Sequence, residues 1–143
     1  MSPLDQQLFV RKATFIDEDL QKLAPFAKLS QDQYIENMEA QQQVERLLER
    51  IVDRLIDLNY HIVKEISQQI PRDYHDSFIR LGKEQIVPQE LAKKMAQSAG
   101  MRNILAHEYD EVDPKQIYLA ISPVLTDVPQ YLKCIIHKFA STP

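Results

Sequence analysis

The residues best suited to chemistry lie in one short segment, Arg102 to Tyr109, which reads RNILAHEY. Arginine can grip a phosphate through its planar guanidinium, and histidine exchanges protons near neutral pH. The amide of Asn103 can orient an imidazole or bind a ribose hydroxyl. This set suits metal-independent cleavage of RNA, in which the 2′-hydroxyl attacks the adjacent phosphate. His107 would assist proton transfer, and Arg102 would stabilise charge on the phosphoryl oxygens.

The spacing within this segment sets a geometric condition. On a continuing helix successive residues turn by about 100°, so Asn103 and His107 share a face, whereas Arg102 and His107 lie about 140° apart. The pair can serve one site if the helix unwinds near Ala106, or if a second copy of the segment faces the first across a twofold axis. Composition alone also allows a simpler interpretation, in which Arg102 is a solvated charge and His107 caps a helix.

Helices must position this segment, because the rest of the chain shows helical periodicity and no lasting alternation of period two. The apolar spacing and the cap and stop residues predict helices over residues 8–25, 30–37, 38–69, 73–83, 88–107 and 113–140. The sequence therefore predicts an all-α fold, a single bundle of about five to six helices that spans residues 1–143 as one domain.

Several residues carry sharper local predictions. Ser30 and Gln33 have the spacing of a capping box, and Gly82 is expected to stop its helix. Gly100 lies inside a predicted helix, which suggests close approach by another helix. Pro123 and Pro129 fall inside the last helix, so we expect a kink or a break there.

The composition excludes some classes of protein. Hydrophobic residues make up 44% of the 143 residues and charged residues 27%, as in ordinary soluble proteins. The net charge of −4 argues against broad binding along nucleic acid, although not against a small basic cleft. No membrane span or signal peptide is visible, and the single Cys134 fits a reducing cytoplasm. The cysteine and the four histidines show no zinc-site spacing, so we expect no metal and no cofactor.

The motif and several longer segments resemble the HepT-like toxins of the HEPN superfamily. The family pattern is Arg-x4-His-x-Tyr, commonly with asparagine after the arginine and followed by Asp-Pro. It stands here as RNILAHEY and then DEVDP. FIDEDLQKL, IDLNYHIV, SFIRLGKEQIVPQELAKKMAQSAGMRN and VDPKQIY also look like family segments. One departure is Asn59-Tyr60-His61, where relatives often read Ala-Asn-His.

The resemblance implies a homodimer whose two motifs meet in a cleft. It also implies an endoribonuclease toxin of a type VII toxin–antitoxin system, restrained by a nucleotidyltransferase (MNT-type) antitoxin that modifies the motif tyrosine. Carried over by position, Arg102 and His107 are the catalytic pair, Asn103 supports them, and Tyr109 is the residue that receives AMP.

Two further residues and two rival functions complete the expectations. Asp57 and His61 lie one turn apart in the long predicted helix, so they are candidates for a supporting pair near the motif, or for a polar pair on a solvated or dimer-facing side.

The first rival function is a helical module that binds RNA or a nucleotidyltransferase without cutting. The second is a purely structural dimer.

Overall fold

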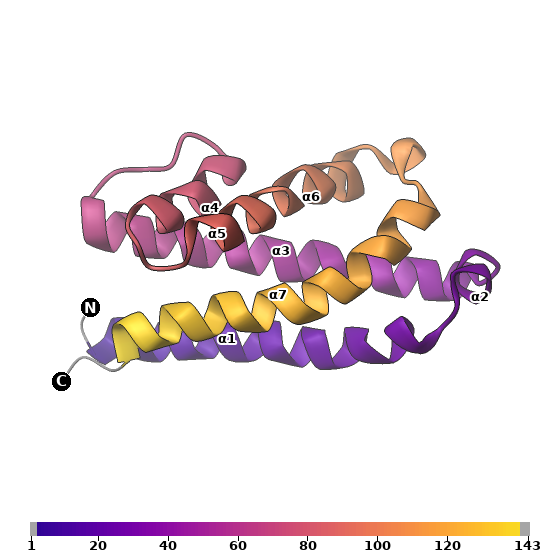
Figure 1. The fold of residues 1–143 in the computed structure, drawn as a ribbon, viewed down its shortest axis with the longest axis horizontal. Coiled ribbons are helices and arrows are strands. Elements are labelled where there is room, and N and C mark those ends of the chain that lie inside the picture. Colours follow the sequence, from indigo (N-terminus) through magenta and orange to yellow (C-terminus); the bar gives the residue numbers. More distant parts are fainter. Residues whose placement is uncertain (1–2, 141–143) are drawn as a thin grey trace.

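The computed structural model describes residues 3–140, apart from the side chains of residues 3, 4, 109 and 140. The long helices that run the length of the molecule are α1 (Pro3–Leu23), α3 (Met38–Ser67) and α7 (Pro114–Ala140) (Figure 1). The shorter helices on one side of α3 are α4 (Tyr74–Lys83), α5 (Gln89–Ala96) and α6 (Ser98–His107). The remaining short elements are the 3-10 helix η1 (Ala24–Lys28), α2 (Gln31–Ile35) and the 3-10 helix η2 (Tyr109–Glu111).

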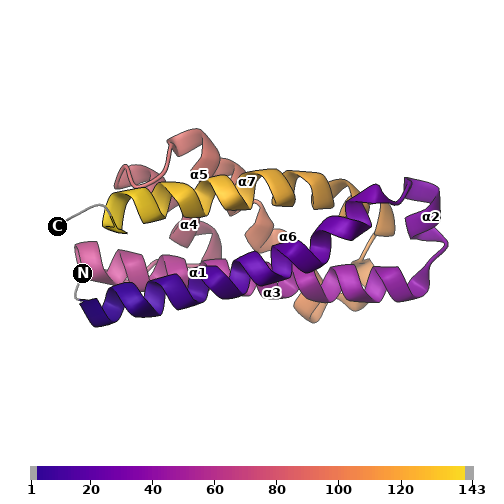
Figure 2. The ribbon, with the colours of Figure 1, turned by 90° about the horizontal axis from the view of Figure 1, so that it is seen from below.

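The long helix α3 is the centre of the bundle. It contacts α1, α4 and α6, and α1 also contacts α7, as Figures 1 and 2 show from two sides. A helix with several neighbours needs a broad apolar face. The buried apolar residues of α3 are Ala40, Val44, Leu47, Leu48, Ile51, Val52, Leu55, Ile56, Leu58, Ile62 and Val63. The described residues contain no strand, so the predicted all-α fold class is confirmed.

The helix ends follow the local chemistry that the sequence indicated, with one exception. Ser30 and Gln33 form the expected capping box before α2. Asp73 caps α4 by accepting a hydrogen bond from the backbone of Asp76 at 2.7 Å. The expected helix over 88–107 is divided at Gln97 into α5 and α6. The last helix, α7, runs without a break through both internal prolines, and its course curves in Figure 1.

The two glycines have roles that the sequence did not predict. Gly82 lies inside α4 and does not stop it; a Cβ there would stand 2.9 Å from the Cβ of Ala92 on α5. The close approach expected at Gly100 occurs instead at Gly82, since a Cβ on Gly100 would have nothing within 4 Å. The expectation for Gly82 was therefore wrong, and no helix within the described chain makes the approach expected at Gly100. Gly82 is needed because α4 and α5 pack closely there.

A polar network joins three helices in the centre of the core. Asn59 on α3, which is fully buried, donates to Ser77 Oγ of α4 at 3.1 Å and accepts from Tyr131 Oη of α7 at 2.6 Å. Buried polar groups are costly unless they are paired, so this network fixes how α3, α4 and α7 sit together. It also shows that the asparagine of the Asn59-Tyr60-His61 departure belongs to the core.

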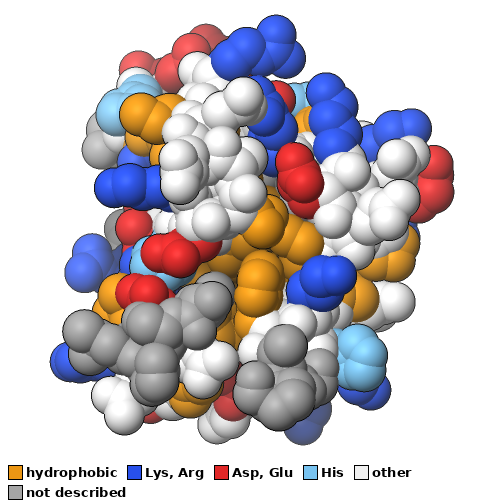
Figure 3. All heavy atoms as spheres, turned by 90° about the vertical axis from the view of Figure 1, so that its left-hand side faces the viewer, with side chains coloured by type: hydrophobic (Ala, Val, Ile, Leu, Met, Phe, Trp, Pro, Cys, Tyr) orange, Lys and Arg blue, Asp and Glu red, His pale blue; other side chains and the backbone are white. Residues whose placement is uncertain are grey.

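Both termini lie at the same end of the bundle (Figure 1). Figure 3 looks onto this end, where apolar side chains are visible in a hollow between charged ones. None of the helices in the described part is both long enough and apolar enough to cross a membrane.

Candidate functional site

The motif lies at the C-terminal end of α6, which ends at His107 as the sequence predicted. Arg102 Nη1 lies 3.4 Å from His107 Nε2 in the same chain. The helix runs through Ala106 without unwinding. Neither condition set by the 140° offset is therefore needed for contact, because the arginine side chain is long enough to reach around the helix. A guanidinium can only donate, so in this contact His107 Nε2 is the acceptor.

The guanidinium of Arg102 is held by a carboxylate on α3. Arg102 Nε donates to Asp53 Oδ1 at 2.5 Å, and the two side chains are 17% and 43% exposed. The hydrogen bond to Asp53 raises the pKa of Arg102, against the opposing effect of partial burial. Arg102 is therefore a permanent cation with one edge fixed on Asp53 and Nη1 directed towards His107.

An aromatic ring supports the same guanidinium. The Cζ atom of Arg102 lies 5.4 Å from the ring centre of Tyr74, which is within cation–π range. Tyr60 packs edge-on against Tyr74, with ring centres 6.3 Å apart and an interplanar angle of 81°. Residues from α3, α4 and α6 thus fix the position of one cation, which is the kind of preorganisation that anion binding needs.

The remaining motif residues lie on either side of this contact. Asn103 is exposed and its Oδ1 lies 3.5 Å from Arg102 Nη1, at the limit of a hydrogen bond. Tyr109 lies past the end of α6, where it begins η2. Its side chain lies outside the described residues. Arg102, Asn103 and His107 therefore form one group near the end of α6, in which Asn103 and His107 are exposed and Arg102 is partly buried.

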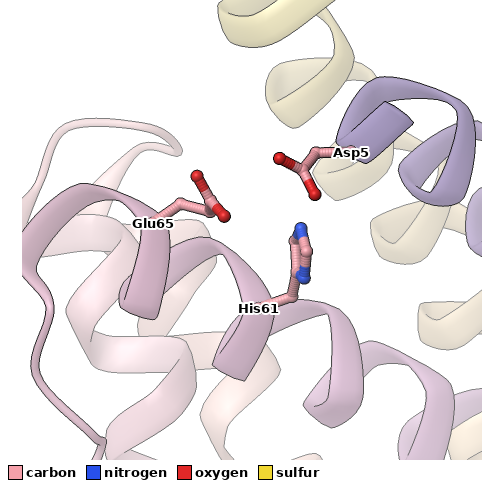
Figure 4. Close-up of side chains that lie close together, drawn as sticks. All are labelled: Asp5, His61 and Glu65. Carbon is pink, nitrogen blue, oxygen red and sulfur yellow. The ribbon is translucent and has the colours of Figure 1, made fainter. Parts of the chain in front are cut away.

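Asp57 and His61 have other neighbours. Asp57 Oδ2 lies 2.7 Å from Lys12 Nζ of α1, and the Asp57 side chain is 63% exposed. His61 lies one turn further along α3, where its ring faces Asp5 and Glu65 (Figure 4). No described contact joins either residue to Arg102 or His107.

Sequence reasoning missed Asp53 and Tyr74. Asp53 precedes Asp57 by one turn of α3, so the spacing that singled out Asp57 also marks Asp53 as a candidate. What the sequence lacked was the position of α6 along α3, which decides which of the two carboxylates Arg102 meets. Tyr74 is 38% exposed at the start of α4, and no pattern in the sequence marks it as a neighbour of Arg102.

A groove of about 510 Å³ lies between α3, α6 and α7. Met101 and Ile104 line it from α6, and Val124 and Val128 line it from α7. Arg102 and His107 do not line it. The chemistry-bearing residues are thus on a more open face of α6 than the groove.

Comparison with known proteins identifies the family of this chain. The family model described as "Ribonuclease HepT-like" matches residues 16–135. The chain is 38% identical over 135 residues to the tRNA nuclease HepT of Aphanizomenon flos-aquae, covering 94% of this chain and 92% of that protein. It is 28% identical over 75 residues to the mRNA nuclease HepT of Shewanella oneidensis, covering 52% and 56%. The chain therefore belongs to the HepT-like ribonuclease family.

Solved structures show the same fold. A toxin–antitoxin structure with AMP-PNP superimposes with a TM-score of 0.83 at 22% identity, covering 92% of this chain and 98% of that one. The tri-AMPylated Shewanella oneidensis HEPN toxin in complex with MNT antitoxin superimposes with a TM-score of 0.83 at 23% identity. This match covers 96% of this chain and 99% of that one. The predicted family and the predicted enzyme class, a ribonuclease, are both confirmed.

Proposed function

We propose that this chain is the endoribonuclease toxin of a toxin–antitoxin pair, that it acts in the cytoplasm, and that it cuts RNA without a metal through Arg102 and His107. The observation that carries this proposal is the 3.4 Å contact between Arg102 Nη1 and His107 Nε2, with the guanidinium held by Asp53. A fixed cation beside an imidazole on an exposed surface is the arrangement that phosphoryl transfer from a 2′-hydroxyl requires.

The proposed step moves two protons. The 2′-oxygen forms a bond to phosphorus while the bond from phosphorus to the 5′-oxygen breaks, leaving a cyclic phosphate and a 5′-hydroxyl. The imidazole of His107 takes the proton of the 2′-hydroxyl, and the leaving 5′-oxygen must receive a proton. Arg102 binds the phosphoryl oxygens, where negative charge increases in the transition state. Asn103 orients the imidazole or the ribose.

A homodimer would supply the second proton-transferring group. With the motifs facing each other across a twofold axis, the two copies of His107 can serve as base and acid. Three features support this arrangement: His107 is exposed, the space beside Gly100 is open, and an apolar groove adjoins the same helix. Light scattering at micromolar concentration tests it. A monomer that cuts RNA fully would contradict the dimer.

The proposed antitoxin is a nucleotidyltransferase that attaches AMP to Tyr109. Support comes from the motif position of Tyr109, from its place just past α6, and from an AMPylated toxin among the proteins of the same fold. A phosphodiester at this position would compete with RNA for Arg102, and the adenosine would obstruct the site.

Catalysis is tested with purified protein, RNA and chelator. We expect wild-type protein to cut and Arg102→Ala and His107→Ala to lose cleavage while they keep their helicity. The double variant should be no worse than either single variant, because the two groups act in one step. Folded single variants that cut like wild type would refute the catalytic assignment. They would favour the rival module that binds without cutting, in which the Arg102–Asp53 pair only stabilises the fold.

Control by the antitoxin is tested by mass spectrometry after incubation with the transferase and ATP. We expect an adenylyl adduct on Tyr109 and loss of cleavage. A Tyr109→Phe protein should remain toxic and should escape neutralisation. A neutralised complex with unmodified Tyr109 would show that the antitoxin inhibits by covering the site instead.

A further inference from the structure

Three metal-ligating side chains meet where the start of α1 faces the end of α3. Asp5 comes from α1, and His61 and Glu65 lie one turn apart on α3, so that they share a face. One nitrogen or oxygen atom from each residue lies within 4.8 Å of the other two. Figure 4 shows the imidazole pointing into the space between the two carboxylates. On this end of the bundle, acidic and histidine side chains lie side by side (Figure 3).

The buried nitrogen of His61 is the second observation. Its Nε2 atom is shielded from solvent and has no hydrogen-bond partner among the residues that the structure describes. Buried polar atoms in proteins are nearly always paired, and an exception indicates a partner such as an ion. The ring is aimed at the two carboxylates but stops short of bonding either of them. An ion placed between the three groups would give His61 Nε2 the partner that it lacks.

The donor set selects the kind of ion. A neutral imidazole and two carboxylates together carry two negative charges, which match a divalent cation. Mixed nitrogen and oxygen ligands suit zinc and its transition-metal neighbours, whereas Mg²⁺ and Ca²⁺ prefer oxygen alone. Ligand atoms at about 2.0–2.2 Å from zinc stand about 3–4 Å from one another. The present spacing needs only a small closure, and the exposed Glu65 can supply it.

We propose that Asp5, His61 and Glu65 form a binding site for a divalent transition-metal ion of the zinc class, with water in the remaining position. The ion ties the first turn of α1 to the last turns of α3. The site lies about 12 Å along α3 from Asp53, at 1.5 Å per residue, so its ion does not reach Arg102. The role is therefore structural, and the proposed cleavage of RNA stays independent of metal.

The test uses the full chain, stripped of metal with chelator and desalted. Titration with Zn²⁺ should show one saturable site and a rise in melting temperature, because a ligand that binds only the folded state stabilises it. Co²⁺ should give a visible absorption band that reports a nitrogen and oxygen ligand set. Glu65→Gln and Asp5→Asn should each weaken Zn²⁺ binding by at least about ten-fold, since even groups that only orient a ligand change affinity by about 10–100-fold.

The matched control is Asp57→Asn, which removes a carboxylate from the same face of α3 one turn away, where it pairs with Lys12. This variant should bind Zn²⁺ like wild type. His61→Gln should lose the Co²⁺ band. Binding that is absent, or that is unchanged in Glu65→Gln and Asp5→Asn, would overturn the proposal and assign any residual binding to the exposed histidines. RNA cleavage by the stripped protein is measured separately, so failure of the metal site leaves the nuclease proposal intact.

Discussion

Asp53 is expected to act on catalysis through Arg102, and Asp53→Asn isolates that effect. Asparagine keeps an oxygen that can accept from Arg102 Nε but removes the negative charge. The guanidinium of Arg102 would then be held less firmly. Without its negative charge, residue 53 would also no longer compete with the RNA phosphate for Arg102. We therefore expect kcat to fall and KM to stay level or decrease.

The expected fall in kcat depends on how far solvent screens the pair of Arg102 and Asp53. A hydrogen bond between charged groups contributes about 1.5–3 kcal/mol when it is shielded from water. Arg102 is 17% exposed but Asp53 is 43% exposed, so solvent screens part of this interaction. About 1 kcal/mol remains, which corresponds to a fall in kcat of about five-fold. Loss of the guanidinium itself, in Arg102→Ala, should cost about 10²–10³-fold, as for other preorganised donors.

The assay is steady-state cleavage of an RNA oligonucleotide, with circular dichroism as the check on folding. Asp57→Asn is the control, because it lies one turn further along α3 and removes an ion pair with Lys12 that does not touch the motif. If Asp53→Asn loses no more kcat than Asp57→Asn, Asp53 does not position the arginine. A rise in KM at constant kcat would show instead that Asp53 contributes only to substrate binding.

Three further predictions concern stability and are measured by chemical denaturation. Gly82→Ala should destabilise by about 1–3 kcal/mol through overpacking against α5, whereas Gly100→Ala should be neutral or stabilising by up to about 1 kcal/mol; equal effects would contradict the packing. Tyr131→Phe should lower the free energy of unfolding by about 1–3 kcal/mol, because it leaves the buried amide oxygen of Asn59 unpaired. An unchanged free energy of unfolding would show that this polar network does not stabilise the core. Burial raises the pKa of Asp76, but the backbone N–H of Arg72 and two guanidinium groups outweigh it, so the pKa is lowered from 3.8. The stability that Asp76 contributes should therefore be present above that pH and lost as the pH falls below it, and Asp76→Asn should not show this loss.

The fold was largely predictable because helix signals are local. The apolar period of α3, the capping box at Ser30 and the end of α6 at His107 each depend on residues within a few turns of one another. The glycines were not predictable in the same way. Whether Gly82 or Gly100 meets another helix depends on the approach of α5, which no local pattern contains.

The motif residues of the site could be predicted from the sequence, but the residue that holds Arg102 in place could not. Arg102 and His107 are separated by five positions, whereas Asp53 is 49 positions away in sequence from the arginine that it holds. The choice between Asp53 and Asp57 depends on where α6 lies along the length of α3. The cluster of Asp5 with His61 was equally invisible, because only the antiparallel packing of α1 and α3 brings these side chains together.

The network of Asn59, Ser77 and Tyr131 has a consequence for synthesis of the protein. A nascent chain that ends at α6 already contains Arg102, Asn103 and His107, together with Asp53 and Tyr74. It still lacks the hydroxyl that Asn59 needs, since Tyr131 follows 72 positions later. The buried amide can be satisfied only when α7 has left the ribosome. The polar network at the centre of the core is therefore completed only after α7 has been made.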